Sequence, residues 1–256
     1  MITSFPPVAG STSLASNAPW YVQVARGLVP GCSVVNVFGY NSSMTTTACL
    51  VWELGNVPTQ YVYPTAAVQL SIVSDSASDT SAKSVLISGL DASYNAISET
   101  KTLNGTGTVT TVKSYLRVNS VVMTNSVNTG NITITSSSPT AGNVVAKINA
   151  GLGKNQAALY TVPAGYTLYG NRFSGFSSEA GGGNNYSLWI AKTSNAVTGQ
   201  SLTVAQSPYA NNYTIPRTAP FTFAEKTDIQ WQAQTGTGSH PIGVNVEGVL
   251  ISNTAA

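Results

Sequence analysis

The sequence has few charged side chains. Eleven Lys and Arg and nine Asp and Glu make up 8% of the 256 residues, against a usual share of ~25%. The net charge of +2 is spread along the chain, so no basic patch can neutralise many phosphates. We therefore expect no nucleic-acid partner, and a polar surface built from Ser, Thr, Asn, Gln and Gly.

Cysteines and long apolar runs are also scarce. Cys32 and Cys49 are too few for a disulfide framework and lack the spacing of a zinc site, so we expect two buried free thiols, with a single bridge as the alternative. No apolar run approaches the ~20 residues that span a bilayer, and MITSFPPVAGSTS lacks the basic start and apolar centre of a signal peptide. We expect a soluble protein, made in the cytoplasm, with no membrane partner.

Alternating apolar residues are plentiful from residue 66 onwards. In AAVQLSIVS, Val68, Leu70 and Ile72 recur at every second position and so share one face of a strand. KSVLISGL and AISETKTL repeat the pattern on either side of a hairpin-length connection over residues 91–95, and GNITITSS ends the set. This pattern predicts a small antiparallel sandwich.

The segment AISETKTLNG is predicted to be an edge strand followed by a tight turn. Glu99 and Lys101 fall on the face that carries Ile97, so neither face is strongly apolar. Asn104 and Gly105 are expected to supply the positive φ values of a type I′ turn.

The run that follows, TVTTVKSYLRVNSVVMT, is predicted to place four apolar residues on one face. These residues are Val112, Leu116, Val118 and Val122. Their even spacing favours a strand that contributes one side to the same sandwich.

A second β unit is predicted from Asn143 to the C-terminus. NVVAKINAGLG alternates, residues 163–165 form a Pro-Ala-Gly turn between two strands, and later segments bring the number of strands to seven or eight. Strands ~10–15 residues apart are typical of a sandwich or jelly roll.

The predicted fold class is therefore all-β, with two β-sandwich or jelly-roll-like domains and an extended N-terminal arm. The arm and an extended region are assigned to residues 1–59, the first sandwich to residues 60–138, and the second sandwich or jelly roll to residues 143–256. Pro139 and Gly142 interrupt the strand pattern at the boundary.

Catalytic groups are hard to find. His240 is the single histidine and lies in a predicted loop, so a Ser-His-acid triad has no distinguishing signal. Glu53 beside Trp52, and Glu247, lie among apolar residues that could raise a carboxyl pKa, but a strand-edge carboxylate with a backbone or Arg partner is the favoured interpretation. We predict that the protein is not an enzyme and has no catalytic residue.

Metal and cofactor motifs are equally weak. Asp75 and Asp79 in SDSASD could bind Ca²⁺, but EF-hand spacing is absent and Asx-turns explain them. GLGK at residues 151–154 and NGTG at residues 104–107 are not phosphate loops. We expect no metal and no cofactor.

Aromatic residues in the second unit leave a sugar-binding surface open as an alternative. Trp189, Trp231, Tyr209 and Tyr213 could stack on sugar rings if exposed, with the loop over residues 181–185 beside them. Alternating aromatics in strands usually fill a core, and that interpretation is favoured.

Several segments resemble virion structural proteins of tailed bacteriophages, notably phages of cyanobacteria and other aquatic bacteria. The resemblance is carried by ARGLVPGCSVVNVFGYN, VWELGNVPTQYVYPTAA, SIVSDSASDTSAKSVLISGLDASYNAISETKTLNGTGTVTTVKSYLRVNSV, INAGLGKNQAALYTVPAGYTLYG and TDIQWQAQTGTGSHPIGVNVEGVLI, in matching order over more than half of the chain. The family carries no catalytic motif.

The resemblance implies a non-enzymatic protein of the virion, assembled in the host cytoplasm. We favour an outer-capsid cement, or decoration, protein that binds the major capsid protein and itself as a homotrimer. The alternative is a tail, neck or fibre component, with a host glycan as its partner if it is an adhesin.

Overall fold

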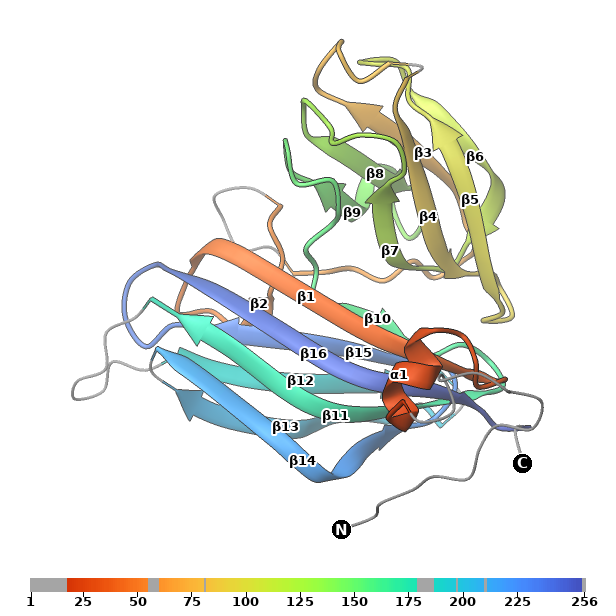
Figure 1. The fold of residues 1–256 in the computed structure, drawn as a ribbon. Helices are drawn as coiled ribbons and strands as arrows, with labels where there is room; N and C mark the ends of the chain where they lie inside the picture. Colours follow the sequence, from red (N-terminus) through yellow and green to blue (C-terminus); the bar gives the residue numbers. More distant parts are fainter. Residues whose placement is uncertain are drawn as a thin grey trace.

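The chain folds into two antiparallel β-sandwiches (Figure 1). The computed structural model describes residues 18–54, 60–80, 82–178, 187–196, 198–209 and 211–254. Apart from the helix α1 (Trp20–Ala25), all regular elements in these ranges are strands, so the predicted all-β class is confirmed. No helix in the same ranges is long and apolar enough to cross a membrane.

The larger sandwich packs two sheets around one core. The sheets have the orders β1-β16-β11-β14 and β10-β15-β12-β13, and β2 also pairs with β15. Trp189, Trp231 and Phe173 fill this core and are each at most 1% exposed. The strands are β1 (Cys32–Met44), β2 (Cys49–Leu50), β10 (Leu159–Thr161), β11 (Tyr166–Ser177), β12 (Ser187–Asn195), β13 (Ser201–Tyr209), β14 (Asn212–Phe223), β15 (Thr227–Gln234) and β16 (His240–Ser252).

Two short strands mark the place where the chain leaves the larger sandwich and returns to it. β10 pairs with residues 228–230 of β15 and β2 pairs with residues 232–233, both antiparallel. β2 and β10 therefore lie end to end beside β15, as two halves of one strand. An isolated β-bridge between Trp52 and Ala157 joins the residues that follow β2 to the residues that precede β10. The smaller sandwich is inserted between these halves.

The smaller sandwich has sheets of order β6-β3-β8-β9 and β5-β4-β7. Leu70 and Ile72 are fully buried in its core, as the alternation predicts, together with Ile87 from the facing sheet. The strands are β3 (Val68–Ser74), β4 (Ser84–Leu90), β5 (Ala96–Thr102), β6 (Val109–Tyr115), β7 (Arg117–Met123), β8 (Ile132–Ser136) and β9 (Asn143–Ile148).

The predicted domain boundaries differ from these pairings. The expected arm and extended region over residues 1–59 is wrong for β1 and β2, because they pair with β16 and β15 in the larger sandwich. The expected break between residues 138 and 143 is also wrong, because β9 pairs with β8 and completes the smaller sandwich. Residues 1–17 and 55–59, which belong to the same expectation, lie outside the described residues.

The run over residues 108–124 forms two strands in different sheets. β6 ends at Tyr115 and β7 begins at Arg117, so the chain changes sheets between them. Val118 is buried as expected, but Val112 is 75% exposed. The predicted common face is wrong for Val112 because β6 turns Thr111 and Tyr115 to the core, which leaves Val112 on the outer face. There the carboxylate of Glu99 accepts the N–H groups of Val112 and Lys113.

Strand β5 lies at a sheet edge, as predicted, but the turn after it is not type I′. Gly105 has φ +57°, whereas Asn104 and Thr106 do not have positive φ. Gly107 N–H donates to Asn104 O at 2.9 Å, which makes Gly105 the first central residue of the turn, as in type II′. The next strand, β6, belongs to the other sheet of the smaller sandwich. The turn therefore does not have to match the twist of two paired strands.

A buried carboxylate joins three segments of the smaller sandwich. Asp79 is fully buried and accepts hydrogen bonds from Lys83 Nζ (2.7 Å), Ser74 Oγ (2.6 Å), Thr129 N–H (2.7 Å) and Gly130 N–H (3.0 Å). Burial alone opposes ionisation, but these donors outweigh it and hold the pKa of Asp79 well below its usual range. The charge thus links the end of β3 to the segments that precede β4 and β8.

We predict that Asp79→Asn lowers the free energy of unfolding by about 2–3 kcal/mol at neutral pH, because an amide places donors against donors and removes the counter-charge of Lys83. The folded pKa lies below the unfolded value of about 4, so this contribution is complete above that value and is lost as the pH falls through the folded pKa. Urea unfolding followed by circular dichroism should show the difference from the parent protein shrinking from about pH 5 to about pH 2.

Asp75→Asn is the matched control for this prediction. The exposed Asp75 carboxylate accepts two hydrogen bonds from Asn131, so its loss should cost less than about 1 kcal/mol. Equal losses in the two variants, or a loss in Asp79→Asn that is independent of pH, would contradict the assignment.

Candidate functional site: the cleft between the two sandwiches

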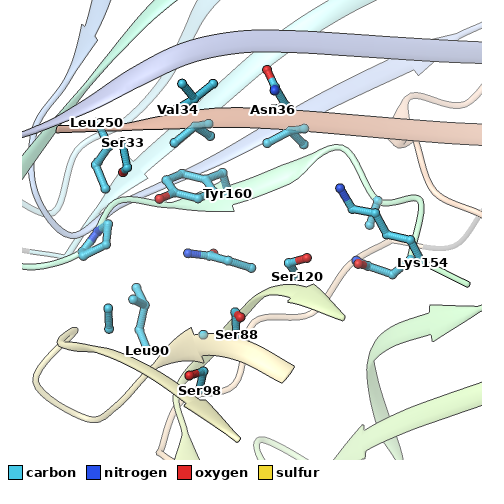
Figure 2. A pocket seen from close by; sticks show the side chains of 18 of the residues that line it. Ser33, Val34, Asn36, Ser88, Leu90, Ser98, Ser120, Lys154, Tyr160 and Leu250 are labelled. Carbon is cyan, nitrogen blue, oxygen red and sulfur yellow. The ribbon is translucent and has the colours of Figure 1, made fainter. Parts of the chain in front are cut away.

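A cleft of about 440 Å³ lies between the two sandwiches. Figure 2 shows β1 on one side, the sheet β5-β4-β7 on the other, and the ring of Tyr160 between them. Both sandwiches contribute walls, and the segment that returns to β10 contributes the base. The cleft is therefore the place where the inserted sandwich creates something that neither sandwich has alone.

One wall of the cleft is the unpaired edge of β1. Successive residues of a strand direct their N–H and C=O groups alternately to its two sides. Cys32 N–H donates to Val29 O and Tyr40 N–H to Gln156 O, both away from β16. The even-numbered residues between them face the same way, and within the described ranges no strand pairs with that side of β1. The backbone N–H and C=O groups of Val34, Asn36 and Phe38 thus open into the cleft.

The opposite wall is the outer face of the sheet β5-β4-β7. Ser98, Ser88 and Ser120 lie directly opposite one another across the three strands. Figure 2 shows this row of serines facing the cleft, with Leu90 beside it. Such small side chains leave a flat wall that a polypeptide backbone can approach closely.

The base of the cleft is held by amide side chains. Asn119 Nδ2 donates to Thr161 O and Thr161 N–H donates to Asn119 Oδ1, both at 2.9 Å, which ties β7 to β10. Asn155 Oδ1 accepts Val121 N–H at 2.8 Å. Burial raises the pKa of Tyr160, so its phenol is neutral at physiological pH. These contacts fix the separation of the two walls.

A buried ion pair forms the joint beside the cleft. Arg117 at the start of β7 and Asp228 in β15 make two parallel hydrogen bonds, Nε to Oδ1 at 2.7 Å and the second guanidinium N–H to Oδ2 at 2.8 Å. The two side chains are 9% and 7% exposed. Asp228 Oδ1 also accepts Thr161 Oγ1 at 2.6 Å. A bidentate pair of this kind fixes orientation as well as distance.

Arg117 organises the surrounding chain segments as well. Its guanidinium donates to Pro64 O (2.8 Å), which lies in the segment between β2 and β3, and is 4.6 Å from the ring centroid of Tyr63. Burial opposes its charge, but the hydrogen bonds and charge of Asp228 outweigh this and raise the pKa of Arg117. The cation is therefore permanent.

The predicted hairpin connection over residues 91–95 takes part in the same joint. Tyr94 has φ +66° and its carbonyl accepts Ala164 N–H at 2.9 Å, from the predicted turn at residues 163–165. Its ring lies 5.7 Å from the Arg117 guanidinium. A short loop of the smaller sandwich thus holds a turn of the larger one.

The cleft is lined mainly by neutral groups. Of the residues that line it, Lys154 is the one charged side chain, and the others offer backbone groups, hydroxyls, amides and apolar side chains that include Phe38. General acid–base catalysis needs a titratable group within hydrogen-bond reach of the substrate at a suitable pKa. Lys154 and Tyr160 are the titratable side chains of the lining, and the rest of it presents neutral hydrogen-bonding and apolar groups.

The carboxylates considered from sequence have structural partners. Glu53 accepts Ser42 N–H at 3.0 Å and Ser42 Oγ at 2.7 Å. Glu247 lies 4.0 Å from Arg172 Nε and accepts Asn245 Nδ2 at 3.2 Å. Both fit the favoured interpretation of strand carboxylates with backbone or Arg partners, and neither lies among the residues that line the cleft.

The other candidate residues are scattered. His240 begins β16 rather than lying in a loop, and Asp75 and Asp79 hold loops of the smaller sandwich. Within the described ranges no group of three His, Cys, Asp or Glu residues is placed to hold a metal ion. Cys32 and Cys49 are free; Cys49 is buried, which raises its pKa to about 11, whereas Cys32 is only half-buried.

The sugar-binding alternative is wrong for Trp189 and Trp231. Trp189 and Trp231 are 1% and 0% exposed in the core of the larger sandwich, and Tyr213 packs against that core. The side chain of Tyr209 and the loop over residues 181–185 lie outside the described residues. Core filling, the favoured interpretation of these aromatics, holds for both tryptophans.

Sequence reasoning did not identify the two walls of the cleft. Residues 34–38 and the three serines carry ordinary side chains, and the wall of β1 works through peptide groups that every residue possesses. A local signal existed only in part, as the alternation of SVVNVFGYN indicates a strand without showing which of its edges stays open.

Comparisons with known proteins add little. No family model matches the chain, and no curated protein matches it. Among solved structures, the chain is similar to one described as the structure of infectious bursal disease virus Gt strain, at 10% identity over 92% of this chain and 78% of that chain, with a TM-score of 0.19. A likeness this distant carries no argument about function.

We predict that Arg117→Ala lowers the free energy of unfolding by about 3–5 kcal/mol, because it leaves Asp228 buried without its counter-charge. It should also uncouple the sandwiches. Trp20, Trp52, Trp189 and Trp231 are the chain's tryptophans, and none lies in the smaller sandwich. Urea transitions followed by tryptophan fluorescence and by circular dichroism should coincide in the parent protein and separate in the variant.

Arg172→Ala is the matched control. Its pair with Glu247 is long, and the two side chains are 51% and 39% exposed, so the change should stay within about 0.5 kcal/mol. If Arg117→Ala were no more disruptive than Arg172→Ala, the joint would not depend on the buried pair.

Proposed function

We propose that the protein is a non-enzymatic structural component of a tailed-phage virion and acts as an outer-capsid cement protein that stabilises the coat lattice. The segments that resemble phage virion proteins include residues 25–41 and 71–121, which contain both walls of the cleft. The partners we propose are the major capsid protein and further copies of this chain as a homotrimer, with assembly in the host cytoplasm.

The observation that carries the proposal is the strand order of the larger sandwich. With β2 and β10 counted as one strand, its eight strands follow the orders 1-8-3-6 and 2-7-4-5. Sheets that interleave strands from both ends of the chain in this way are typical of a jelly roll, an architecture that viral capsid proteins use repeatedly.

The surface chemistry supports a building role. The cleft presents peptide groups and hydroxyls, which suit pairing with another backbone. The joint at Arg117 and Asp228 holds the two sandwiches in one relation, which suits a protein that transmits load between neighbours in a lattice.

We predict that purified virions contain on the order of hundreds of copies of this chain, because a cement protein follows the symmetry of the coat lattice. Quantitative mass spectrometry against the major coat protein measures this ratio. A few dozen copies or fewer would place the chain on the tail, neck or fibre and would reject the cement role.

A tail, neck or fibre component that binds a host glycan is the second candidate, and a different set of aromatics favours it. Phe38 and Phe176 are each 38% exposed on the open face of the sheet β1-β16-β11-β14, and the rings of Tyr40 and Phe176 lie 6.1 Å apart. A Cβ at Gly243 would overlap the Phe176 ring, so the glycine lets this ring lie flat. Exposed rings on a flat sheet suit stacking against sugars.

For this candidate we predict a glycan-array signal that Phe176→Ala reduces at least about tenfold, which corresponds to about 1.4 kcal/mol of stacking. Leu202→Ala is the control, since Leu202 is 53% exposed on β13 in the other sheet. Absence of any signal from the parent protein, or equal loss in both variants, would remove the adhesin.

A further inference from the structure

The edge of β1 in the cleft is an acceptor for one additional strand. Three peptide groups of β1 face the cleft at every second position, over residues 34–38, and a donor strand would pair with them across about 4.8 Å. The other edge strand that borders the cleft is β5, and its edge is already in use. Lys113 Nζ donates to Ser98 O at 2.8 Å, and the Glu99 carboxylate accepts Val112 N–H from β6. The acceptor is therefore β1.

We propose that this cleft receives residues 8–17 of a second copy of the chain as an added β-strand, so that subunits are joined by exchange of their N-terminal segments. The inference deepens the self-association part of the proposed function. It is tested on purified protein without particles, so either one can fail while the other stands.

The sequence of the N-terminal segment fits the cleft. Residues 1–17 contain no charged side chain, and the cleft is lined by neutral groups except at Lys154. Pro6 and Pro7 cannot donate to a ladder, which leaves residues 8–17 for pairing. In VAGSTSLASN one alternating set consists of Ala, Ser and Asn, and small side chains of this kind can lie against the serine wall.

The N-terminal segment is connected to α1, and this connection indicates that the segment in the cleft comes from a second copy and not from the same chain. Ala18 O accepts Gln23 Nε2 at 2.7 Å and Pro19 O accepts Val22 N–H at 2.9 Å, so the segment starts from a fixed point at the beginning of α1. In Figure 1 this helix lies beside the start of β1, and none of its residues lines the cleft. Pairing with residues 34–38 of β1 uses about five of the ten residues, and the remaining five reach at most about 17 Å. A segment from a neighbour has no such restriction.

The first test is disulfide trapping between full-length chains. One chain carries one added cysteine at each of positions 9–15 in turn, and the other carries Asn36→Cys. Both carry Cys32→Ser because Cys32 lies on the same strand, and both keep the buried Cys49. Mixed chains should give covalent dimers under mild oxidation, with yields that alternate between odd and even donor positions, as strand pairing requires. Val112→Cys, 75% exposed on β6, replaces Asn36→Cys as the control and should give none.

The second test compares two substitutions at one position. Asn36→Pro removes an outward N–H of β1, whereas Asn36→Thr keeps it, and the side chain is exposed in both cases. Light scattering after gel filtration should show an oligomer for the parent protein and for Asn36→Thr. For Asn36→Pro we expect dissociation at least about tenfold easier, with an unchanged circular dichroism spectrum.

Three outcomes would overturn the inference. A parent protein that is monomeric at micromolar concentration has no exchanged segment. Cross-links that form only within one chain, when both cysteines are placed on it, would assign the segment to its own cleft. Yields that do not alternate, or that Val112→Cys matches, would show random collision instead of strand addition.

Discussion

The buried pair of Arg117 and Asp228 is the contact on which the arrangement of this molecule depends. Removing two charges from water is costly unless they meet in good geometry and their remaining hydrogen-bond capacity is used. Here Thr161 donates to Asp228, and the carbonyls of Pro64 and Leu116 accept hydrogen bonds from the guanidinium of Arg117. These partners come from both sandwiches and from the segment between β2 and β3, so the pair is satisfied in one relative placement of the sandwiches. That placement sets the width of the cleft.

The sequence predicted those features of the fold that depend on the order of neighbouring residues. The period of two in residues 66–74 places Leu70 and Ile72 in a core, because alternation decides which face of a strand meets solvent. The charges of β5 predicted an edge strand, since charged side chains discourage further pairing. The connection over residues 91–95 was predicted as a turn, but its second role at the joint was not, because Tyr94 meets the other sandwich only after folding.

The partners of each strand could not be predicted in the same way. β1 pairs with β16 across almost the whole chain, and β2 pairs with β15, so residues that look like an extension of the N-terminus belong to the far sandwich. Alternation does not record which sheet a strand joins, and it missed the change of sheet between β6 and β7. Asp228 stands in TDIQWQAQ with no local sign that its partner lies 111 residues away. The walls of the cleft follow from these distant pairings.

An open strand edge is a hazard for a β protein, and the two edges that border the cleft are handled differently. β5 is protected by charge: Glu99 and Lys101 lie on it, and its carbonyl at Ser98 is already occupied. β1 has no charged residue, and its protection is steric, because the serine wall of the smaller sandwich stands opposite it. In the strand addition that we propose, this wall excludes a second sheet and admits a single extended segment with small side chains. The inserted sandwich therefore turns an edge that would pair indiscriminately into one that selects its partner by size.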